Sequence, residues 1–363
     1  MQNTLLIMQN TKNCSIIKND SRLTLAKDWI KNLNISQFID LNSLRTASED
    51  ASFRRYFRVN DSREYKSLIL MDSPPNSEPI EKFIYVADIF TRAKLSVPKI
   101  FEKNQDDGFL ILEDFGLKTY LDCYVNKPNN TSQLLETACN SIIQLQLWGL
   151  HNYDHCTKLS AFSEEMFMEE LKLFEYWYLK KHLKFSLSKV EQENLRIIFK
   201  VLSTKISIEP RVIVHRDFHS RNLMVLEKEN TVGILDFQDA VFGPVSYDLA
   251  SLVRDAYFNW DKENELNWAK LFWNNAKKQK IPLPQNFSDF LIDFDWNSIQ
   301  RHLKILGIFC RLAHRDNKKK YLKDLSRVRL KCIEVASKYK EFTNLINLFE
   351  KIEKLSDTNQ KYF

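Results

Sequence analysis

The chain has 363 residues, of which 44% are hydrophobic and 28% charged, and its formal net charge at pH 7 is +6. These values predict a globular protein that buries one large core or two smaller ones, and they argue against a disordered or fibrous chain. No basic run is interleaved with aromatic residues and no apolar run approaches the roughly 20 residues that span a bilayer, so we expect neither nucleic-acid binding nor membrane insertion.

The first part of the chain predicts a tail, two helices and a small antiparallel sheet. Residues 1–20 are rich in asparagine and lack periodicity, and an amphipathic helix follows around Trp29. A second helix is expected at residues 78–95, and Asp-Gly ending at Gly108 is typical of a hairpin turn. The predicted strands are at residues 53–59, 67–71, 99–103 and 109–112.

Long aromatic-rich helical segments predominate after Gly116, interrupted by short strand-like runs at residues 211–214 and 231–235. Ser163 precedes two glutamates and is expected to cap one of these helices. We therefore expect an α+β fold that contains a small antiparallel-sheet lobe and a mostly helical lobe. The predicted divisions are a tail at residues 1–20, the sheet lobe at 21–112 and the helical lobe at 113–363.

Three polar residues stand in the order that phosphoryl transfer requires. Asn222 follows Asp217 by five residues, and Asp236 closely follows the next predicted strand, which a hairpin would bring back beside Asn222. Phosphoryl transfer needs a carboxylate that accepts or orients the attacking hydroxyl, and oxygen ligands for Mg²⁺ on the nucleotide. We predict that Asp217 is the catalytic carboxylate and that Asn222 and Asp236 bind magnesium.

The surrounding motifs carry a resemblance to a known family. HRDFHSRNLM at residues 215–224, ILDFQDA at 234–240 and GPVSYDLA at 243–250 resemble the aminoglycoside phosphotransferase and choline kinase family. The resemblance implies a two-lobe, protein-kinase-like fold, with ATP and magnesium bound between the lobes. It also implies that the acceptor is the hydroxyl group of a small molecule.

A narrower resemblance covers most of the chain. ASFRRYFRV at residues 51–59, MDSPP at 71–75, FLILEDFG at 109–116 and LGIFCRL at 306–312 are similar to bacterial N-acetylmuramate and N-acetylglucosamine anomeric kinases. This resemblance implies phosphorylation of the C1 hydroxyl of an amino sugar in peptidoglycan recycling. The implied partners are ATP and the sugar, and we expect a cytoplasmic monomer.

The nucleotide side departs from the usual kinase pattern. No glycine precedes Gly108 and the expected lysine strand contains no lysine, so the chain lacks a glycine-rich phosphate loop. Ser52, Arg54 and Arg58 are the nearest substitutes, since a serine-led turn and a guanidinium group both bind phosphate. The alternative is that these arginines simply face solvent on an edge strand. By the resemblance, the backbone around Glu113 and Phe115 holds the adenine.

Several polar residues near the three central ones could contact the acceptor. Sugar hydroxyls and an acetamido group need paired donors and acceptors. Two candidates lie inside the catalytic loop, two follow the metal-binding aspartate and one lies on the next predicted helix. The predicted substrate-binding residues are His219, Arg221, Gln238, Asp239 and Arg254. We expect His215 and Asp248 to support the loop rather than to touch substrate.

Three rival functions stay open at this stage. A kinase of another small hydroxyl compound, such as choline, homoserine or an aminoglycoside, shares the central motif. A nucleotide-binding pseudokinase is suggested by the absent strand lysine, whereas a protein kinase is disfavoured because no Ala-Pro-Glu segment follows. A second His-Arg-Asp ends at Asp316 but has Tyr321 where the metal-binding asparagine would stand, so it fails as a catalytic loop.

Overall fold

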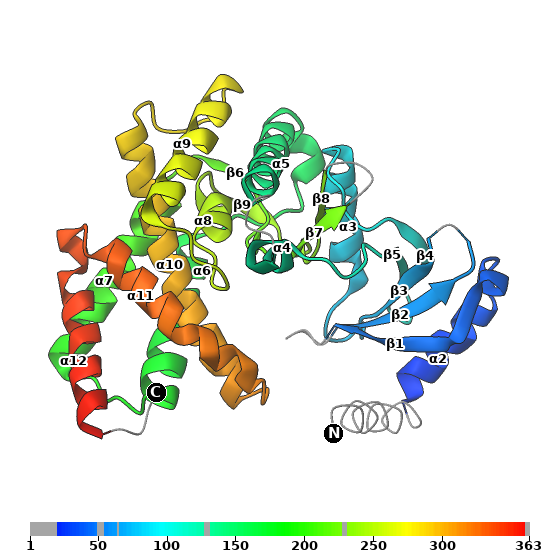
Figure 1. Cartoon of the computed structure of the whole chain (residues 1–363), viewed down its shortest axis with the longest axis horizontal. Helices are drawn as coiled ribbons and strands as arrows, with labels where there is room; N and C mark the ends of the chain where they lie inside the picture. Colours follow the sequence, from blue (N-terminus) through cyan, green and yellow to red (C-terminus); the bar gives the residue numbers. More distant parts are fainter. Residues whose placement is uncertain (1–19, 49–53, 64, 127–130, 227–230, 360–363) are drawn as a thin grey trace. The chain divides into compact units, whose positions relative to one another are not determined.

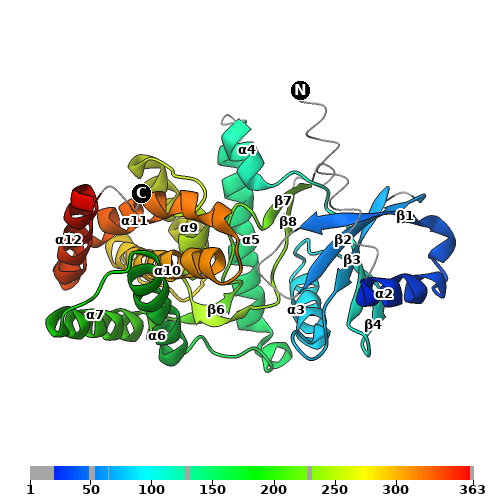
Figure 2. The same cartoon turned by 90° about the horizontal axis from the view of Figure 1, so that it is seen from below.

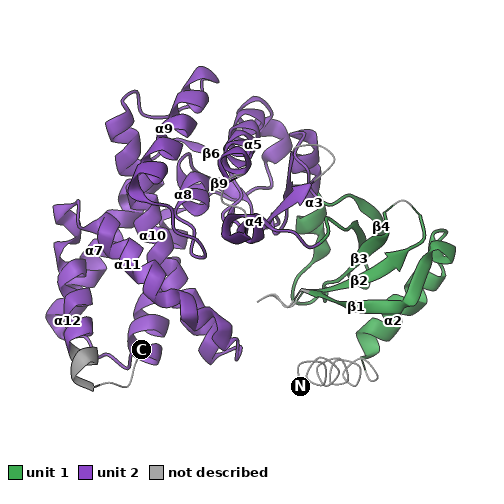
Figure 3. Cartoon of the chain, in the orientation of Figure 1, with its two compact units in different colours: residues 1–85, 98–116 green, residues 86–97, 117–363 purple. Residues whose placement is uncertain are grey.

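A computed structural model describes residues 20–48, 54–63, 65–126, 131–226 and 231–359 (Figure 1). The predicted tail up to residue 19 therefore lies outside the described residues. The chain divides into two compact units, one made of residues 1–85 and 98–116 and the other of residues 86–97 and 117–363 (Figure 3).

The helices and strands follow the chain in this order. Those of the first 116 residues are α2 (Ser21–Lys31), η2 (Ser36–Phe38), β1 (Ile39–Ser48), β2 (Arg55–Asp61), β3 (Ser67–Asp72), α3 (Ile80–Arg92), β4 (Ile100–Asn104) and β5 (Phe109–Glu113). Those up to residue 214 are α4 (Tyr120–Asn126), α5 (Thr131–His151), η4 (Tyr153–Cys156), α6 (Glu164–Leu173), η5 (Phe174–His182), α7 (Lys189–Ser207) and β6 (Arg211–Val214). The remainder are β7 (Leu223–Leu226), β8 (Thr231–Ile234), β9 (Val241–Pro244), α8 (Tyr247–Val253), α9 (Lys262–Lys278), α10 (Phe287–His314), η6 (Lys319–Asp324), α11 (Leu325–Ala336), η7 (Lys340–Phe342) and α12 (Thr343–Asn359).

The first unit is an antiparallel sheet whose strands lie in the order β1-β2-β3-β5-β4, with α2 packed against it (Figure 2). Leu23, Ala26 and Ile30 recur at helical spacing on α2 and join the core of the sheet. Trp29 stacks on Phe109 with ring centroids 5.9 Å apart. The predicted hairpins β2-β3 and β4-β5 are both confirmed.

Strand β1 was not predicted from the sequence. Its residues, IDLNSLRTAS, do not alternate cleanly between apolar and polar. Its pairing with β2 is also irregular, since the register shifts between Asp40 and Arg45 and again between Thr46 and Ser48. The alternation that identifies a half-buried strand is lost at such bulges.

The second unit is mostly helical and is organised around α10. This helix is buried along most of its length and packs against α6, η5, α8 and α11. At Gly307 it comes so close to α6 that a Cβ atom would lie 2.3 Å from the carbonyl carbon of Leu173. The helix that follows the predicted cap at Ser163 continues beyond Leu173, but as the π-helical segment η5, whose first residue is Phe174.

Two short two-stranded sheets lie within this helical unit. Strand β7 pairs with β8, as predicted, and β6 pairs with β9. Strand β9 was not predicted, because Gly243 and Pro244 disfavour a strand. Gly243 is required there, since a Cβ atom would lie 2.6 Å from Cγ2 of Val214 on the paired strand. No helix in the described part of the chain is both long and apolar enough to cross a membrane.

Candidate active site

The predicted catalytic loop joins β6 to β7, and a buried carboxylate fixes its start. Asp248, in the first turn of α8, accepts hydrogen bonds from the backbone N–H groups of His215 (2.6 Å) and Arg216 (3.0 Å). Arg216 adopts a left-handed backbone conformation with φ 77°. Because non-glycine residues rarely adopt this conformation, the two hydrogen bonds hold a turn that the sequence alone would not favour. The expected supporting role of Asp248 is confirmed.

His215 connects the backbone of Asp217, the predicted catalytic residue, to that of Leu235, which directly precedes Asp236. Its Nε2 lies 2.9 Å from the carbonyl oxygen of Leu235, and the backbone N–H of Asp217 donates to its Nδ1 at 3.3 Å. Burial lowers the pKa of His215 to about 4, so the ring is neutral at pH 7. A neutral ring that accepts at Nδ1 carries its proton on Nε2 and donates it to Leu235. His215 thus supports the loop through backbone hydrogen bonds, as expected.

This neutral histidine predicts a pH-dependent stability. His215 has a folded pKa of about 4, below the unfolded value of 6.5, so its contribution is full above pH 6.5 and is lost as the pH falls towards 4. The loss is at most about 3 kcal/mol, because one pKa unit corresponds to about 1.4 kcal/mol. In urea unfolding at pH 7, 5.5 and 4.5, we expect His215→Gln to be less stable than wild type at pH 7 and to lose less stability on acidification. Parallel losses in the two proteins would contradict this prediction.

The predicted magnesium ligands lie side by side. The β7-β8 hairpin places Nδ2 of Asn222 3.4 Å from Oδ2 of Asp236, which confirms the predicted approach of the two residues. Asn222 also donates from Nδ2 to the backbone carbonyl of Asp217 at 3.0 Å, and Gln238 donates to Oδ1 of Asp236 at 2.7 Å. Asp236 is exposed and left-handed, with φ 61°. The Asn222 amide oxygen and the Asp236 carboxylate are hard oxygen donors of the kind Mg²⁺ requires.

These two residues do not form a complete metal cage by themselves. Within the described ranges, no group of three His, Cys, Asp or Glu side chains is placed to hold an ion. Mg²⁺ bound together with a nucleotide commonly takes one or two protein carboxylates and completes its shell with phosphate oxygens and water.

Asp217 lies in a strongly cationic environment. Its side chain is 40% exposed, and Nη2 of Arg301 on α10 lies 3.7 Å from its Oδ1. Burial alone would raise the pKa of Asp217, but the positive charges of Lys304 and Arg301 outweigh burial and hold that pKa well below its usual range. Asp217 is therefore an anion at any physiological pH. A carboxylate of such low basicity suits hydrogen bonding to an acceptor hydroxyl better than early removal of its proton.

The cations beside Asp217 are held by a second buried carboxylate. Glu170 of α6 accepts hydrogen bonds from Arg216 (2.6 Å) and from Gln300 (2.9 Å), and Nζ of Lys304 lies 2.9 Å away. Burial alone would raise the pKa of Glu170, but the positive charges of Lys304 and Arg216 outweigh burial. The net effect lowers this pKa below its usual value, so Glu170 stays ionised. Sequence reasoning missed Arg301 and Lys304. The available signal was a run of polar residues inside an otherwise apolar helix.

The residues predicted to contact substrate are only partly brought together. His219 and Arg221 line one side of the catalytic loop with Tyr257, whose ring lies 5.4 Å from that of His219. Gln238 is buried against Asp236, and Asp239 is exposed.

Arg254 is not part of this group. Its side chain is 3% exposed and forms ion pairs with Glu265 at 3.0 Å and with Asp295 at 2.6 Å. An arginine held by two buried carboxylates supports the helices around it and is not available to a sugar. We therefore do not retain Arg254 as a substrate-binding residue.

The predicted phosphate-binding arginines of the first unit have carboxylate partners there. Arg54 lies 3.1 Å from Glu78, and Nη2 of Arg58 donates to Oδ1 of Asp114 at 2.8 Å. Neither arginine is a simple solvent-facing group, since each is largely buried. The third predicted residue, Ser52, lies outside the described residues.

The predicted adenine-binding backbone lies at the end of β5. The backbone N–H of Glu113, the last residue of that strand, donates to the carbonyl of Lys99 at 2.9 Å. Phe115 follows as a half-buried residue, just before the left-handed Gly116. The adenine contact stays a prediction.

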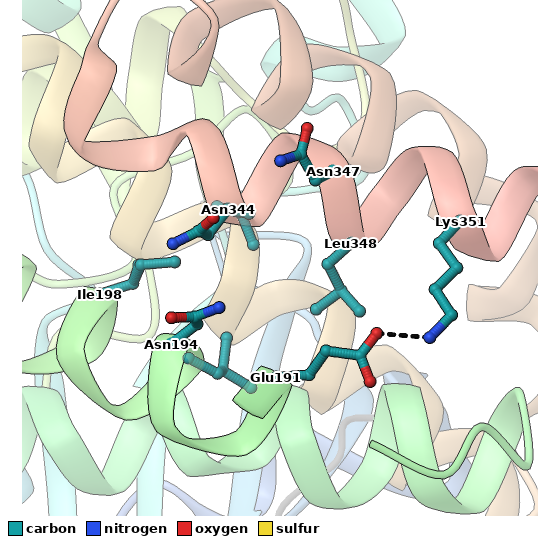
Figure 4. A pocket seen from close by; sticks show the side chains of 9 residues that line it. Glu191, Asn194, Ile198, Asn344, Asn347, Leu348 and Lys351 are labelled. Carbon is teal, nitrogen blue, oxygen red and sulfur yellow. Dashed lines mark hydrogen bonds and ion pairs between the residues drawn. The ribbon is translucent and has the colours of Figure 1, made fainter. Parts of the chain in front are cut away.

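A separate pocket lies between α7 and α12. Figure 4 shows Glu191 and Lys351 paired across it at 2.6 Å, with Asn194, Asn344 and Asn347 beside them. It contains none of the predicted site residues. The catalytic loop, and not this pocket, is the candidate active site.

Comparison with known proteins decides the family. Residues 43–276 match the model of the phosphotransferase enzyme family. The chain belongs to this family. Membership confirms the prediction that the protein is a phosphotransferase. The predicted catalytic loop lies within the matched residues.

Curated relatives within the family share one name. An N-acetylmuramate/N-acetylglucosamine kinase of Pseudomonas aeruginosa is 41% identical over 281 residues, which cover 77% of this chain and 80% of the relative. A protein of the same name from Neisseria meningitidis serogroup B is 33% identical over 324 residues, covering 89% and 93%. The chain is thus similar to these kinases over most of its length.

Solved structures confirm the fold class. ADP-bound aminoglycoside phosphotransferase APH(2'')-Ib is 16% identical with a TM-score of 0.56, and the match covers 87% of this chain and 99% of that one. An ethanolamine kinase of Plasmodium vivax gives a TM-score of 0.57 at 12% identity, covering 85% and 87%. The chain has one unit built on an antiparallel sheet and one mostly helical unit, and these solved structures are similar to it. Together the two observations confirm the predicted α+β, kinase-like fold.

Proposed function

We propose that this protein is an ATP- and magnesium-dependent kinase that phosphorylates the anomeric C1 hydroxyl of N-acetylmuramate, N-acetylglucosamine or both. The observation that carries the proposal is the meeting of Asn222 and Asp236 at the open end of the β7-β8 hairpin, where Asn222 also bonds to the backbone of Asp217. Relatives at up to 41% identity carry the name of such a kinase.

In the proposed reaction, Asp217 hydrogen-bonds to the sugar hydroxyl and orients its oxygen towards the γ-phosphorus of ATP. A new oxygen–phosphorus bond forms, the bond from the γ-phosphorus to the β–γ bridging oxygen breaks, and ADP leaves. The hydroxyl proton passes late to Asp217 or to solvent, since the low pKa of Asp217 makes it a weak base. Asn222 and Asp236 would hold Mg²⁺, which neutralises charge on the phosphate oxygens.

The charges around Asp217 disfavour the rival acceptors. Choline and aminoglycosides are cations, and a cationic acceptor would meet Arg301 and Lys304 beside Asp217 as well as Arg221 in the same loop. A neutral or anionic amino sugar does not suffer this repulsion. The positive charges near Asp217 therefore favour an amino-sugar acceptor over a cationic one.

The cellular setting of the proposal is peptidoglycan recycling in the cytoplasm. Phosphorylation at C1 activates a salvaged sugar as a 1-phosphate for a later nucleotidyl-transfer step. The five cysteines in the described part of the chain are buried and unpaired, which is compatible with a reducing compartment. We propose that the protein acts there as a monomer. We also propose that the first unit and the residues around Glu113 and Phe115 bind ATP.

A substrate panel tests the proposed function. Purified protein with ATP and Mg²⁺ is offered N-acetylmuramate, N-acetylglucosamine, choline or kanamycin, and ADP release is measured. We expect turnover with at least one of the two sugars and none with choline or kanamycin. Loss of the reducing end and a ³¹P resonance coupled to the anomeric proton would place the phosphate on C1. ADP release with choline or kanamycin alone would contradict the proposal.

A further inference from the structure

Arg221 differs from the other arginines around the catalytic loop. Arg216 lies 2.6 Å from Glu170, Arg254 lies 2.6 Å from Asp295, and Arg301 lies 3.7 Å from Asp217. Arg221 forms no ion pair with any carboxylate of the described residues. A partly buried guanidinium without a counterion is a costly arrangement that a ligand carboxylate would relieve.

Two tyrosines hold this guanidinium in place. The Cζ atom of Arg221 lies 4.8 Å from the centroid of the Tyr257 ring and 5.7 Å from that of Tyr321. Phe309 of α10 packs against both rings, at 5.8 Å and 5.2 Å. Stacking on aromatic faces restrains an arginine while leaving the edge of its guanidinium free to donate hydrogen bonds. Although burial opposes its charge, the tyrosines raise the pKa of Arg221, which stays a cation.

The stack is also fixed relative to the catalytic loop. Asp255 accepts a hydrogen bond from the backbone N–H of Ser220 and another from that of Tyr257, both at 2.9 Å. One buried carboxylate therefore ties the residue before Arg221 to the tyrosine that stacks on it. Arg221 in turn precedes Asn222, whose side chain bonds to the backbone of Asp217. The cation is thus held in the same loop as the proposed catalytic carboxylate.

The two proposed sugars differ in charge, which a cation such as Arg221 can distinguish. N-acetylmuramate carries a lactyl ether that ends in a carboxylate, whereas N-acetylglucosamine is neutral. A guanidinium that binds a carboxylate gains a charge-assisted hydrogen bond that a neutral sugar cannot supply. Resting on the amino-sugar kinase function above, we propose that Arg221, held by Tyr257 and Tyr321, binds the carboxylate of the acceptor and makes the enzyme prefer the acidic amino sugar.

The decisive measurement is the ratio of kcat/KM for N-acetylmuramate to kcat/KM for N-acetylglucosamine. Arg221→Gln is expected to lower this ratio about 10- to 100-fold, since one hydrogen bond to a charged group is lost. The loss should appear mainly as a higher KM for N-acetylmuramate, with kcat/KM for N-acetylglucosamine changed by less than about threefold. Arg221→Lys should restore part of the ratio, because it keeps the charge but not the planar fork.

Arg311→Gln is the matched control. Arg311 is another half-buried arginine, two residues beyond Phe309 on α10, and at 3.6 residues per turn its side chain leaves the helix about 200° round from that of Phe309, away from the two tyrosines. It removes the same charge from the same unit, and the ratio should stay at the wild-type value. An equal fall of the ratio in both variants would overturn the inference, because it would show a general electrostatic effect.

The competing source of an anion is the phosphoryl group of ATP. If Arg221 served that group instead, Arg221→Gln would lower kcat by a similar factor for both sugars and leave the ratio unchanged, which would overturn the inference. An unfolded variant would be recognised by loss of N-acetylglucosamine turnover and of the thermal transition, and Arg221→Lys then decides the question through the same ratio. A wild-type protein that phosphorylates neither sugar would instead contradict the proposed function itself.

Discussion

Replacing Asp217 with asparagine is expected to lower kcat by about 10²- to 10⁴-fold, the range that a positioned proton acceptor contributes. Asparagine keeps the shape of the side chain but cannot accept a proton, and it leaves Arg301, 3.7 Å away, without its carboxylate. ATP affinity should change little, because Asp217 acts on the acceptor hydroxyl. ADP release under saturating sugar and isothermal titration with an ATP analogue measure the two quantities.

The sequence offers a control with the same tripeptide. Asp316 ends the second His-Arg-Asp, pairs with the neighbouring Arg315 at 2.7 Å and lies just beyond the C-terminal end of α10, far along the chain from Arg301. Asp316→Asn removes the same charge from the same local sequence and should keep wild-type kcat. Wild-type turnover by Asp217→Asn would contradict the proposed catalytic role.

Replacing Asp236 with asparagine is expected to weaken magnesium-dependent nucleotide binding and to lower kcat by about 10²-fold or more. Asp236 provides the carboxylate beside Asn222, and the loss of one ligand charge reduces affinity for a hard divalent cation. The Mg²⁺ concentration for half-maximal turnover should rise at least about tenfold. A magnesium titration of turnover at fixed ATP measures this shift.

Nucleotide binding without magnesium provides the control for this variant. In EDTA, wild type and Asp236→Asn should bind the ATP analogue with similar, weak affinity, because the difference arises only through the ion. Gln238 donates to Asp236 at 2.7 Å, so the asparagine can keep its position and misfolding is not expected. Superimposable magnesium titrations of the two proteins would contradict the metal-binding role of Asp236.

The approach of the three proposed catalytic and metal-binding residues could be predicted because their signal is local. Asp217 and Asn222 are separated by one short loop, and Asp236 follows one hairpin later, so a spacing rule together with two strand-like runs places all three. The supporting roles of His215 and Asp248 were also within reach. Asp248 accepts from backbone N–H groups of this loop, and His215 bonds to the backbone carbonyl of Leu235, just before Asp236.

The cations and aromatic residues of the site could not be predicted in this way. Arg301 and Lys304 lie more than eighty residues beyond Asp217 on α10, and Tyr257 and Tyr321 come from two further segments. The run of polar residues around Arg301 and Lys304 is a local signal that this part of the helix is unusual, but it does not show which loop these cations face.

Arg254 shows the opposite error. It lies on the predicted helix after the proposed metal-binding loop, and its charge predicts a substrate contact. Its partners Glu265 and Asp295 come from later helices, so only the packing of those helices shows that its charge is already used.

By itself, the sequence determined the class of this protein: an α+β phosphotransferase with its catalytic loop between two short strands. Periodicity and spacing carry that information because secondary structure and hairpins depend on neighbouring residues. Only the tertiary structure decided which charges meet. The cations supplied by α10 make Asp217 a weak base, the carboxylates of later helices neutralise Arg254, and Arg221 is left without a carboxylate among the described residues.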